Sequence, residues 1–412
     1  MYDAIIIGAR VAGSSTARLL ALRGYKVLCV DRARFPSDTV STHMITVEGS
    51  ARLRRWGLLD SIAATGCPAV TNIDLHLDFP RYGPFVLSGF PEPVDDGFAA
   101  IYAPKRTILD KLLIDAAAAA GAEVRQGFTV DELITDDGGA VTGIRGHCGN
   151  GRTVIEKSRI VIGADGYRSL VANAVNAPRY HYAAPKAFGY YTYWTGVPID
   201  SLEFYTRPGM TIIAFPTHDQ HAAVFVERPE RDFSGFKKNI EHNYRATVAE
   251  AAPNLARRID EGELAHRFMG VGNRSNFFRK PGGPGWALVG DAGAHKDPIT
   301  AQGITDAFRD AELLAEAIDS SFSRGTPLQE ALDTYEYRRN AALKPIYDFI
   351  VDHAAMEPFD DAFQDVLAAL RGNPTGLSNF FGVIQNTVAW ADFFSPQNLS
   401  ALLEPGVEPM AS

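Results

Sequence analysis

The chain begins with a short apolar segment that runs directly into a glycine turn and then a helix. Residues 4–7 (Ala-Ile-Ile-Ile) are apolar and mostly β-branched, which predicts a strand buried on both faces. Residues 8–13 (Gly-Ala-Arg-Val-Ala-Gly) form the turn, a helix is expected over 14–23, and a second buried strand over 26–30. A β-α-β unit of this length restricts the chain to an α/β fold with a parallel sheet.

The turn has the residue types that a dinucleotide-binding fold needs. The first glycine, Gly8, allows a tight bend, and the last, Gly13, allows close contact between helix and strand. Asp31, at the end of the second strand, is placed to accept hydrogen bonds from ribose hydroxyls. Arg32 beside it either binds a ribose phosphate or is a solvated surface charge. Together these residues predict dinucleotide binding.

Two further strand ends carry acidic turns. Residues 162–166 read Ile-Gly-Ala-Asp-Gly, and residues 286–292 read Trp-Ala-Leu-Val-Gly-Asp-Ala and continue through 297–304 into a helix. Each turn by itself is also typical of a plain strand-to-helix connection capped by aspartate. Three such motifs in this order favour one nucleotide site assembled from separated segments.

The middle of the chain changes character. Residues 186–227 are rich in Tyr, Phe, Thr and Val and predict a second, antiparallel sheet. A helix is expected over 306–318, and most of the rest to residue 403 is expected to be helical. The expected division is a discontinuous nucleotide domain (1–75, 100–182 and 265–320), a β-rich substrate domain (76–99 and 183–264) and a mostly helical region (321–412).

Composition excludes several classes of function. The formal net charge of −9 argues against nucleic-acid binding, which needs a basic face. The three cysteines are scattered, so we expect neither disulfides nor a metal site, and a reducing cytoplasm fits this pattern. No stretch is long and apolar enough to predict an integral membrane span.

On the three motifs jointly, the chain resembles the FAD-dependent aromatic hydroxylase-type monooxygenase superfamily, which also includes geranylgeranyl reductases and flavin-dependent halogenases. The resemblance covers residues 3–317. It implies a Rossmann-like FAD-binding domain with an inserted antiparallel β-sheet substrate domain and a helical C-terminal region. It also implies noncovalent FAD and NAD(P)H as the electron donor.

The resemblance assigns roles to individual residues. It places Gly8, Ala12 and Gly13 at the pyrophosphate, Asp31 at the adenosine ribose, Arg106 at the start of a helix that reaches the cofactor, Val130 at adenine, Asp165 near both flavin and NAD(P)H, and Asp291 at the ribityl chain or pyrophosphate. The stretch from Pro298 to Ile304 resembles the segment that passes the isoalloxazine ring. There the backbone N–H groups of Gly303 and Ile304 would stabilise the negative charge of reduced flavin.

Arg10 departs from the family pattern, because it replaces the glycine that lets backbone approach the phosphate. One interpretation has its guanidinium reaching phosphate or the flavin edge, which would add a charge-assisted bond. The other has it pointing to solvent or into the substrate cleft. Arg10→Gly binding FAD as tightly as the parent, or more tightly, would rule out the phosphate role.

The leading functional hypothesis is an NAD(P)H-dependent monooxygenase that hydroxylates or epoxidises an aromatic or polycyclic small molecule with molecular oxygen. In this class the flavin delivers the oxygen, so the catalytic side chains stay open, with His43 the only candidate and inert packing its alternative role. Two alternatives remain, namely a geranylgeranyl reductase-like enzyme that saturates C=C bonds and a non-catalytic flavin-binding protein. The halogenase signature W-x-W-x-I-P is missing. Aromatic residues over 380–381 and 390–394 either close the substrate pocket or form a homodimer face.

Overall fold

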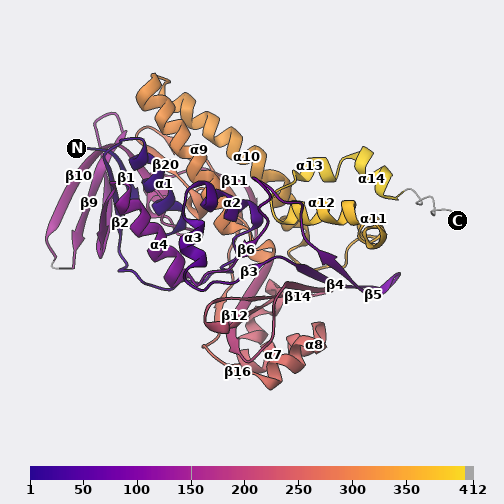
Figure 1. Cartoon of the computed structure of the whole chain (residues 1–412). Helices are drawn as coiled ribbons and strands as arrows, with labels where there is room; N and C mark the ends of the chain where they lie inside the picture. The colour runs from indigo at the N-terminus through magenta and orange to yellow at the C-terminus, as the bar shows by residue number, and fades with distance from the viewer. Residues whose placement is uncertain (150, 404–412) are drawn as a thin grey trace.

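The computed structural model describes residues 1–149 and 151–403. The tail after Leu403, which its Pro and Gly content predicts to be disordered, lies outside the described residues. In Figure 1 the first sheet lies on the left beneath α9 and α10, α7 and α8 lie at the bottom, and α11–α14 extend to the right. Within the described residues, no helix has both the length and the apolar character that crossing a membrane would require.

The first sheet has its strands in the order β19-β20-β10-β1-β2-β7. Their bounds are β1 (Tyr2–Ile7), β2 (Val27–Asp31), β7 (Glu123–Gln126), β10 (Thr153–Gly163), β19 (Gly282–Gly283) and β20 (Trp286–Leu288). The run from β20 to β7 is parallel, and β19 pairs antiparallel with β20. The predicted β-α-β unit is confirmed, and its strands are joined by others that come much later in the chain.

Both faces of this sheet are covered, which is why residues 4–7 of β1 are all apolar. Ala4 and Ile6 pack with α1 (Val11–Leu22), α4 (Arg106–Ala119), α9 (Gly303–Arg324) and α10 (Leu328–His353). Ile5 and Ile7 point the other way, toward a meander of β8 (Phe128–Thr135), β9 (Val141–Cys148) and the first half of β10. The alternation follows from successive side chains of a strand pointing to opposite faces.

The second sheet has the order β16-β12-β15-β14-β13-β4-β5, with β17 also on β12. Its strands are β4 (Ile73–Phe79), β5 (Gly83–Gly89), β12 (Ala187–Thr195), β13 (Leu202–Arg207), β14 (Met210–Pro216), β15 (Ala222–Pro229), β16 (Glu263–Leu264) and β17 (Met269–Val271). The expectation of an antiparallel sheet holds for every pair except β4–β13, which is parallel. The sheet extends beyond the expected domain limits, since β4 begins at Ile73 and β17 reaches Val271.

The second sheet is buried on both faces as well. One face packs against α7 (Ile240–Ala251) and α8 (Pro253–Glu261) through alternate residues such as Val224 and Val226 of β15. The other face, with Ala223 and Phe225, packs against α11 (Asp361–Ala369), α12 (Pro374–Ile384), α13 (Trp390–Phe393) and α14 (Pro396–Leu403). The aromatic residues over 380–381 and 390–394 therefore contribute to this core.

The remaining elements connect the two sheets. The helices among them are α2 (Val47–Arg55), α3 (Leu59–Ala63), α5 (Leu170–Ala174) and α6 (Phe233–Phe236). Two small sheets are formed by β3 (Ala69–Val70) with β6 (Ile101–Tyr102), and by β11 (Arg179–Ala183), β18 (Asn276–Arg279) and β21 (Ala294–His295). Among the described residues there are also five short 3-10 turns, namely η1 (His218–Gln220), η2 (Glu230–Asp232), η3 (Gly290–Ala292), η4 (Pro298–Thr300) and η5 (Leu370–Gly372).

Candidate functional site

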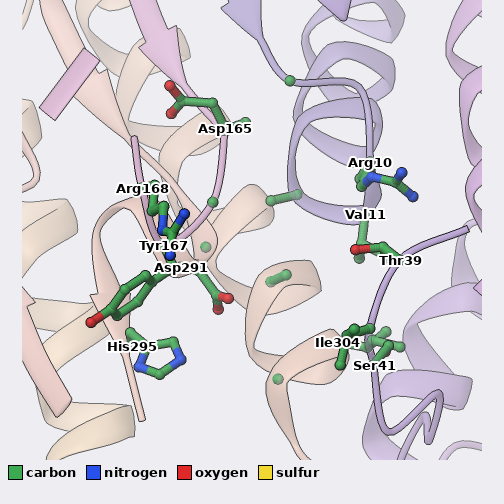
Figure 2. Close-up of a pocket in the computed structure, with 18 of the residues that line it drawn as sticks. Arg10, Val11, Thr39, Ser41, Asp165, Tyr167, Arg168, Asp291, His295 and Ile304 are labelled. Carbon is green, nitrogen blue, oxygen red and sulfur yellow. The ribbon is translucent and has the colours of Figure 1, made fainter. Parts of the chain in front are cut away.

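A cavity of about 850 Å³ lies between the two sheets. Residues at the carboxyl ends of the parallel strands line one side of it, since β1, β2, β10 and β20 all end at the same edge of the first sheet. Ligands of open parallel sheets bind at this edge. Figure 2 shows the two walls, with Arg10, Val11 and Thr39 on one side and Asp165, Tyr167 and His295 on the other. Of the predicted site residues, all but Gly13 and His43 line this cavity.

Two positions of the glycine turn after β1, Gly8 and Gly13, leave no room for a side chain. Gly8 has φ +100°, and a Cβ there would lie 2.4 Å from the carbonyl oxygen of Ala164. A Cβ on Gly13 would lie 1.7 Å from the carbonyl oxygen of Gly8, which explains why Gly13 packs helix on strand instead of facing the cavity. The helix α1 then begins without any side-chain cap, so its first backbone N–H groups are free to bind an anion at the cavity.

Asp31 joins the turn to the end of β2. Its carboxylate accepts hydrogen bonds from the backbone N–H of Ala9 at 2.8 Å and of Ala33 at 2.7 Å. The side chain is half-buried and lines the cavity, as do the exposed Arg32 beside it and Val130 of β8. Asp31 therefore shapes the turn and still presents carboxylate oxygens that can accept from a ligand hydroxyl.

Arg10 adopts neither of its two predicted orientations in full. Its guanidinium donates to the carboxylate of Asp110 on α4 at 2.5 Å and to the carbonyl oxygens of Ser37 at 3.2 Å and Asp38 at 3.0 Å. Asp110 is fully buried and also accepts three hydrogen bonds from Arg106, four residues earlier on α4. Arg10 lies at the cavity wall, but its donors hold the loop after β2 against α4.

The acidic turns after β10 and β20 differ in how they are held. Asp165 accepts the backbone N–H of Leu170 at 2.6 Å through Oδ2, while its Oδ1 is buried without a hydrogen-bond partner among the described residues, and burial raises the pKa of this carboxyl. Asp291 is exposed to the cavity, and its carboxylate has no hydrogen-bond or ion-pair partner in the described part of the chain. Figure 2 shows Asp291 pointing into the space between the walls. Both carboxylates retain acceptor capacity for a ligand.

A second helix N-terminus faces the same cavity. Helix α9 begins at Gly303, follows Gln302 without a side-chain cap, and spans 22 residues. Gly303 and Ile304 both line the cavity, and Pro298 lies just before them. The free N–H groups and the positive end of the helix dipole can stabilise negative charge there. The role of this segment in stabilising negative charge on a cofactor stays a prediction.

The opposite wall of the cavity belongs to the second sheet. Gly189 and Tyr191 of β12, Phe225 and Glu227 of β15, and Val271 of β17 line it. The rings of Tyr191 and Phe225 stack at 4.3 Å between centroids. This end is mostly apolar, which suits a small apolar ring compound.

His43 does not line the cavity. It is fully buried, and its Nε2 is hydrogen-bonded to the hydroxyl of Tyr193. Burial, with the charges of Arg106 and Lys105, lowers its pKa from 6.5 to about 3, so the imidazole is neutral. Its neighbours Ser41 and Thr42 line the cavity instead, which places His43 behind the wall. The geometry favours the packing role over chemistry.

Several lining residues escaped the sequence interpretation. They are Arg168 after the 162–166 motif, Arg274, Lys296, which forms an ion pair with Asp306, and the carboxyl Glu227. Arg168 had a local signal, because it follows the 162–166 motif. The others come to the cavity through pairing between distant segments.

The residues present fit bound FAD. Two uncapped helix N-termini, of α1 and α9, open into one cavity and suit the two parts of the cofactor that carry negative charge. The carboxylates of Asp31 and Asp291 suit the ribose and ribityl hydroxyls, which are donors.

Comparison with known proteins agrees with this site. Residues 1–350 match the family described as FAD binding domain. The chain is similar to the digeranylgeranylglycerophospholipid reductase of Methanocella arvoryzae, at 28% identity over 349 residues that cover 83% of each chain. It is also similar to the 6-methylpretetramide 4-monooxygenase of Streptomyces rimosus, at 23% identity over 82% of this chain and 80% of that protein.

A solved structure has the same overall fold. A flavin-dependent brominase superimposes with a TM-score of 0.81 at 18% identity and covers 97% of both chains. Since the family match spans residues 1–350, well over half of the sequence, it covers the turn, the three acidic strand ends and the N-terminus of α9. The chain belongs to the FAD binding domain family and is an FAD-dependent oxidoreductase.

Proposed function

We propose that the protein is an NAD(P)H-dependent monooxygenase that holds FAD noncovalently and hydroxylates or epoxidises an apolar aromatic or polycyclic small molecule. One observation carries this proposal. A single cavity runs from the glycine turn and Asp31, past the N-terminus of α9, to the aromatic wall formed by Tyr191 and Phe225. Cofactor groups at the first sheet and an apolar substrate at the second would therefore meet at α9.

Each part of the chain has a distinct task in this proposal. Bound FAD would supply the redox chemistry, taking electrons from NAD(P)H and using them on molecular oxygen. The free N–H groups of Gly303 and Ile304 would stabilise negative charge on the reduced ring. Tyr191 and Phe225 would orient the substrate and exclude water from the reacting face. No side chain needs to act as a nucleophile.

A second candidate is a reductase that saturates C=C bonds without oxygen. The similarity to a digeranylgeranylglycerophospholipid reductase favours it, because the match covers 83% of this chain and 83% of that protein. Both candidates share the cofactor and the apolar wall, and they differ in what accepts the electrons. The free cysteines suit the reducing cytoplasm that we infer for either activity.

The deciding experiment compares NAD(P)H consumption with and without oxygen. FAD would first be identified by its absorbance after release from the denatured protein. A monooxygenase should consume NAD(P)H in air at a rate that a bound aromatic compound stimulates, and stop after one reduction of the flavin without oxygen. Sustained anaerobic consumption with a polyunsaturated isoprenoid would instead establish the reductase, and no consumption under either condition would reject both.

A further inference from the structure

A carboxyl lies at the apolar end of the cavity with an oxygen left unbonded. Along β15, Ala223 and Phe225 face the core shared with the C-terminal helices, whereas Val224 and Val226 face α7 and α8. Glu227 follows Phe225 by two residues, so the strand alternation turns its side chain to the same face. The residue is 1% exposed and lines the cavity.

The sheet leaves room for this side chain on the cavity side. Glu227 is directly opposite Gly189 on β12 and Thr211 on β14. A Cβ on Gly189 would lie 3.3 Å from Cγ of Glu227, so the missing side chain at Gly189 makes space for the carboxyl. The Oε2 atom of Glu227 is buried and has no hydrogen-bond partner among the described residues. An unpartnered buried acceptor or donor is costly unless a ligand completes it.

A second buried carboxyl approaches from the loop before η4. Asp297 is 3% exposed, lines the cavity and accepts the backbone N–H of Ile299 at 3.3 Å. Burial and the charge of Asp297 raise the pKa of Glu227 well above its ordinary value. Burial, together with the charge of Glu230, raises the pKa of Asp297 to about 7. Both shifts disfavour the charged form of each carboxyl in this part of the cavity.

The cations near the pair are engaged elsewhere. Lys296 forms an ion pair with Asp306, and Arg274 stacks on the ring of Tyr167 at 5.4 Å. His295 is hydrogen-bonded to the carbonyl oxygen of Ser275 at 2.9 Å, and burial lowers its pKa. Arg228, the next residue of β15, forms an ion pair with Asp232. None of these residues forms an ion pair with Glu227 in the described part of the chain.

We propose that the carboxyl of Glu227 is the polar contact through which this chain holds its substrate, donating a hydrogen bond to a carbonyl oxygen on an otherwise apolar ring compound. The substrate class is thus an apolar aromatic or polycyclic ketone or quinone. A protonated carboxyl has one O–H donor, and the stacked rings of Tyr191 and Phe225 strengthen its bond by excluding water. Asp297 acts through Glu227 as a positioning residue that keeps the proton in place. This inference rests on the proposed function only for the location of the substrate.

The first test measures ligand affinity on FAD-loaded protein, without turnover. The probes are the ketone 1-tetralone, the corresponding hydrocarbon tetralin and the amine 1-aminotetralin. Their binding is detected by the change that each causes in the absorbance of the bound flavin. The parent should prefer the ketone to the hydrocarbon, and Glu227→Leu should reduce this preference about three- to ten-fold, the usual value of one neutral hydrogen bond. Glu227→Gln should retain the preference, because an amide N–H also donates to a carbonyl.

Glu203→Gln is the matched control. Glu203 is a buried glutamate of the same sheet, but it forms an ion pair with Arg258 and does not line the cavity. Its replacement should leave the ketone preference unchanged. The proposal is overturned if Glu227→Leu keeps the full preference or if the parent does not bind the ketone. Tighter binding of the amine that Glu227→Leu abolishes would also overturn it, in favour of a site for cations.

The second test reads the proton directly. Infrared difference spectra at neutral pH should show the C=O stretch of a protonated carboxyl that disappears in Glu227→Gln and persists in Glu203→Gln. Asp297→Asn removes the neighbouring negative charge, so the band should vanish at a lower pH than in the parent. A band unaffected by Glu227→Gln would overturn the assignment.

These readouts separate the inference from the proposed function. If NAD(P)H reduces the flavin and oxygen reoxidises it, but both Glu227 tests fail, only the substrate contact is wrong. If the Glu227 tests succeed while oxygen-dependent consumption is absent, the carbonyl site stands and the monooxygenase assignment fails.

Discussion

The guanidinium of Arg10 donates a 2.5 Å hydrogen bond to the carboxylate of Asp110, one hundred residues later in the chain. Asp110 is fully buried and also held by Arg106, so one carboxylate ties the glycine turn to α4. The second nitrogen of the guanidinium donates to the hydroxyl oxygen of Ser37 and the carbonyl oxygen of Asp38. The residue that breaks the glycine pattern is thus a clamp on the loop that borders the cavity.

Arg10→Gly should release this loop without removing the cofactor site. Asp110 keeps its bonds from Arg106, so we expect a stability loss of about 1–2 kcal/mol and faster proteolysis near Ser37. Denaturant unfolding and limited proteolysis measure the two effects, and Arg10→Lys should be intermediate because its single nitrogen replaces two guanidinium nitrogens that contact separate acceptors. Unchanged proteolysis with weaker, salt-sensitive FAD binding would show instead that the guanidinium contacts phosphate.

Asp31→Ala should weaken FAD binding by about 1–3 kcal/mol, because it removes the acceptor of the Ala9 and Ala33 N–H groups as well as the ribose contact. Titration of the flavin-free protein with FAD measures the change. Asp3→Ala is the control, since Asp3 also accepts a backbone N–H, that of Lys26, but lies at the opposite end of β1. Equal affinities for the parent and the Asp31 variant would contradict the placement of the ribose.

Asp291→Ala should lower the affinity for FAD while leaving the folding stability of the flavin-free protein nearly unchanged. The carboxylate is exposed in the cavity and forms no ion pair among the described residues, so the flavin-free protein should unfold within about 0.5 kcal/mol of the parent. FAD affinity should fall by about 1–3 kcal/mol. A variant with parental FAD affinity would show that Asp291 does not reach the cofactor.

Two glycines of the site should respond differently to alanine. Gly8→Ala places a Cβ 2.4 Å from the carbonyl oxygen of Ala164 at a φ of +100°, so a loss above about 2 kcal/mol and poor FAD retention are expected. A Cβ on Gly303 would meet no protein atom within 4 Å, so Gly303→Ala should fold with parental stability. Melting temperature and flavin content measure both. A stable, yellow Gly8→Ala protein would contradict the geometry of the turn.

His43 should make folding stability depend on pH. Its pKa is about 3 in the folded protein and 6.5 in an ordinary environment, so between these values the unfolded chain binds the extra proton. Stability therefore rises with pH across this range, by at most about 1.4 kcal/mol per pH unit from this group, and falls as pH drops below 6.5. His43→Gln should flatten this slope in denaturant unfolding between about pH 5 and pH 7.5. Full turnover loss with an unaltered slope would instead indicate a chemical role.

Local sequence accounts for the first β-α-β unit and for the acidic turns after β10 and β20. Buried parallel strands are apolar on both faces, and glycine is required where Gly8 and Gly13 leave no room for a Cβ. Because parallel strands end at one edge of a sheet, Asp31, Asp165 and Asp291 can be assigned to one site from their positions along the chain. These features depend on short-range geometry, so residue types and their spacing along the chain are enough to predict them.

Tertiary structure alone decided the remaining contacts. Arg10 donates to Asp110, Glu227 and Asp297 line the same cavity, and β4 pairs in parallel with β13, all across separations that carry no periodic signal. His43 lies behind the cavity wall because the second sheet brings Tyr193 against it. The sequence determined which segments end at the nucleotide edge, whereas burial and long-range strand pairing determined which side chains face the cavity.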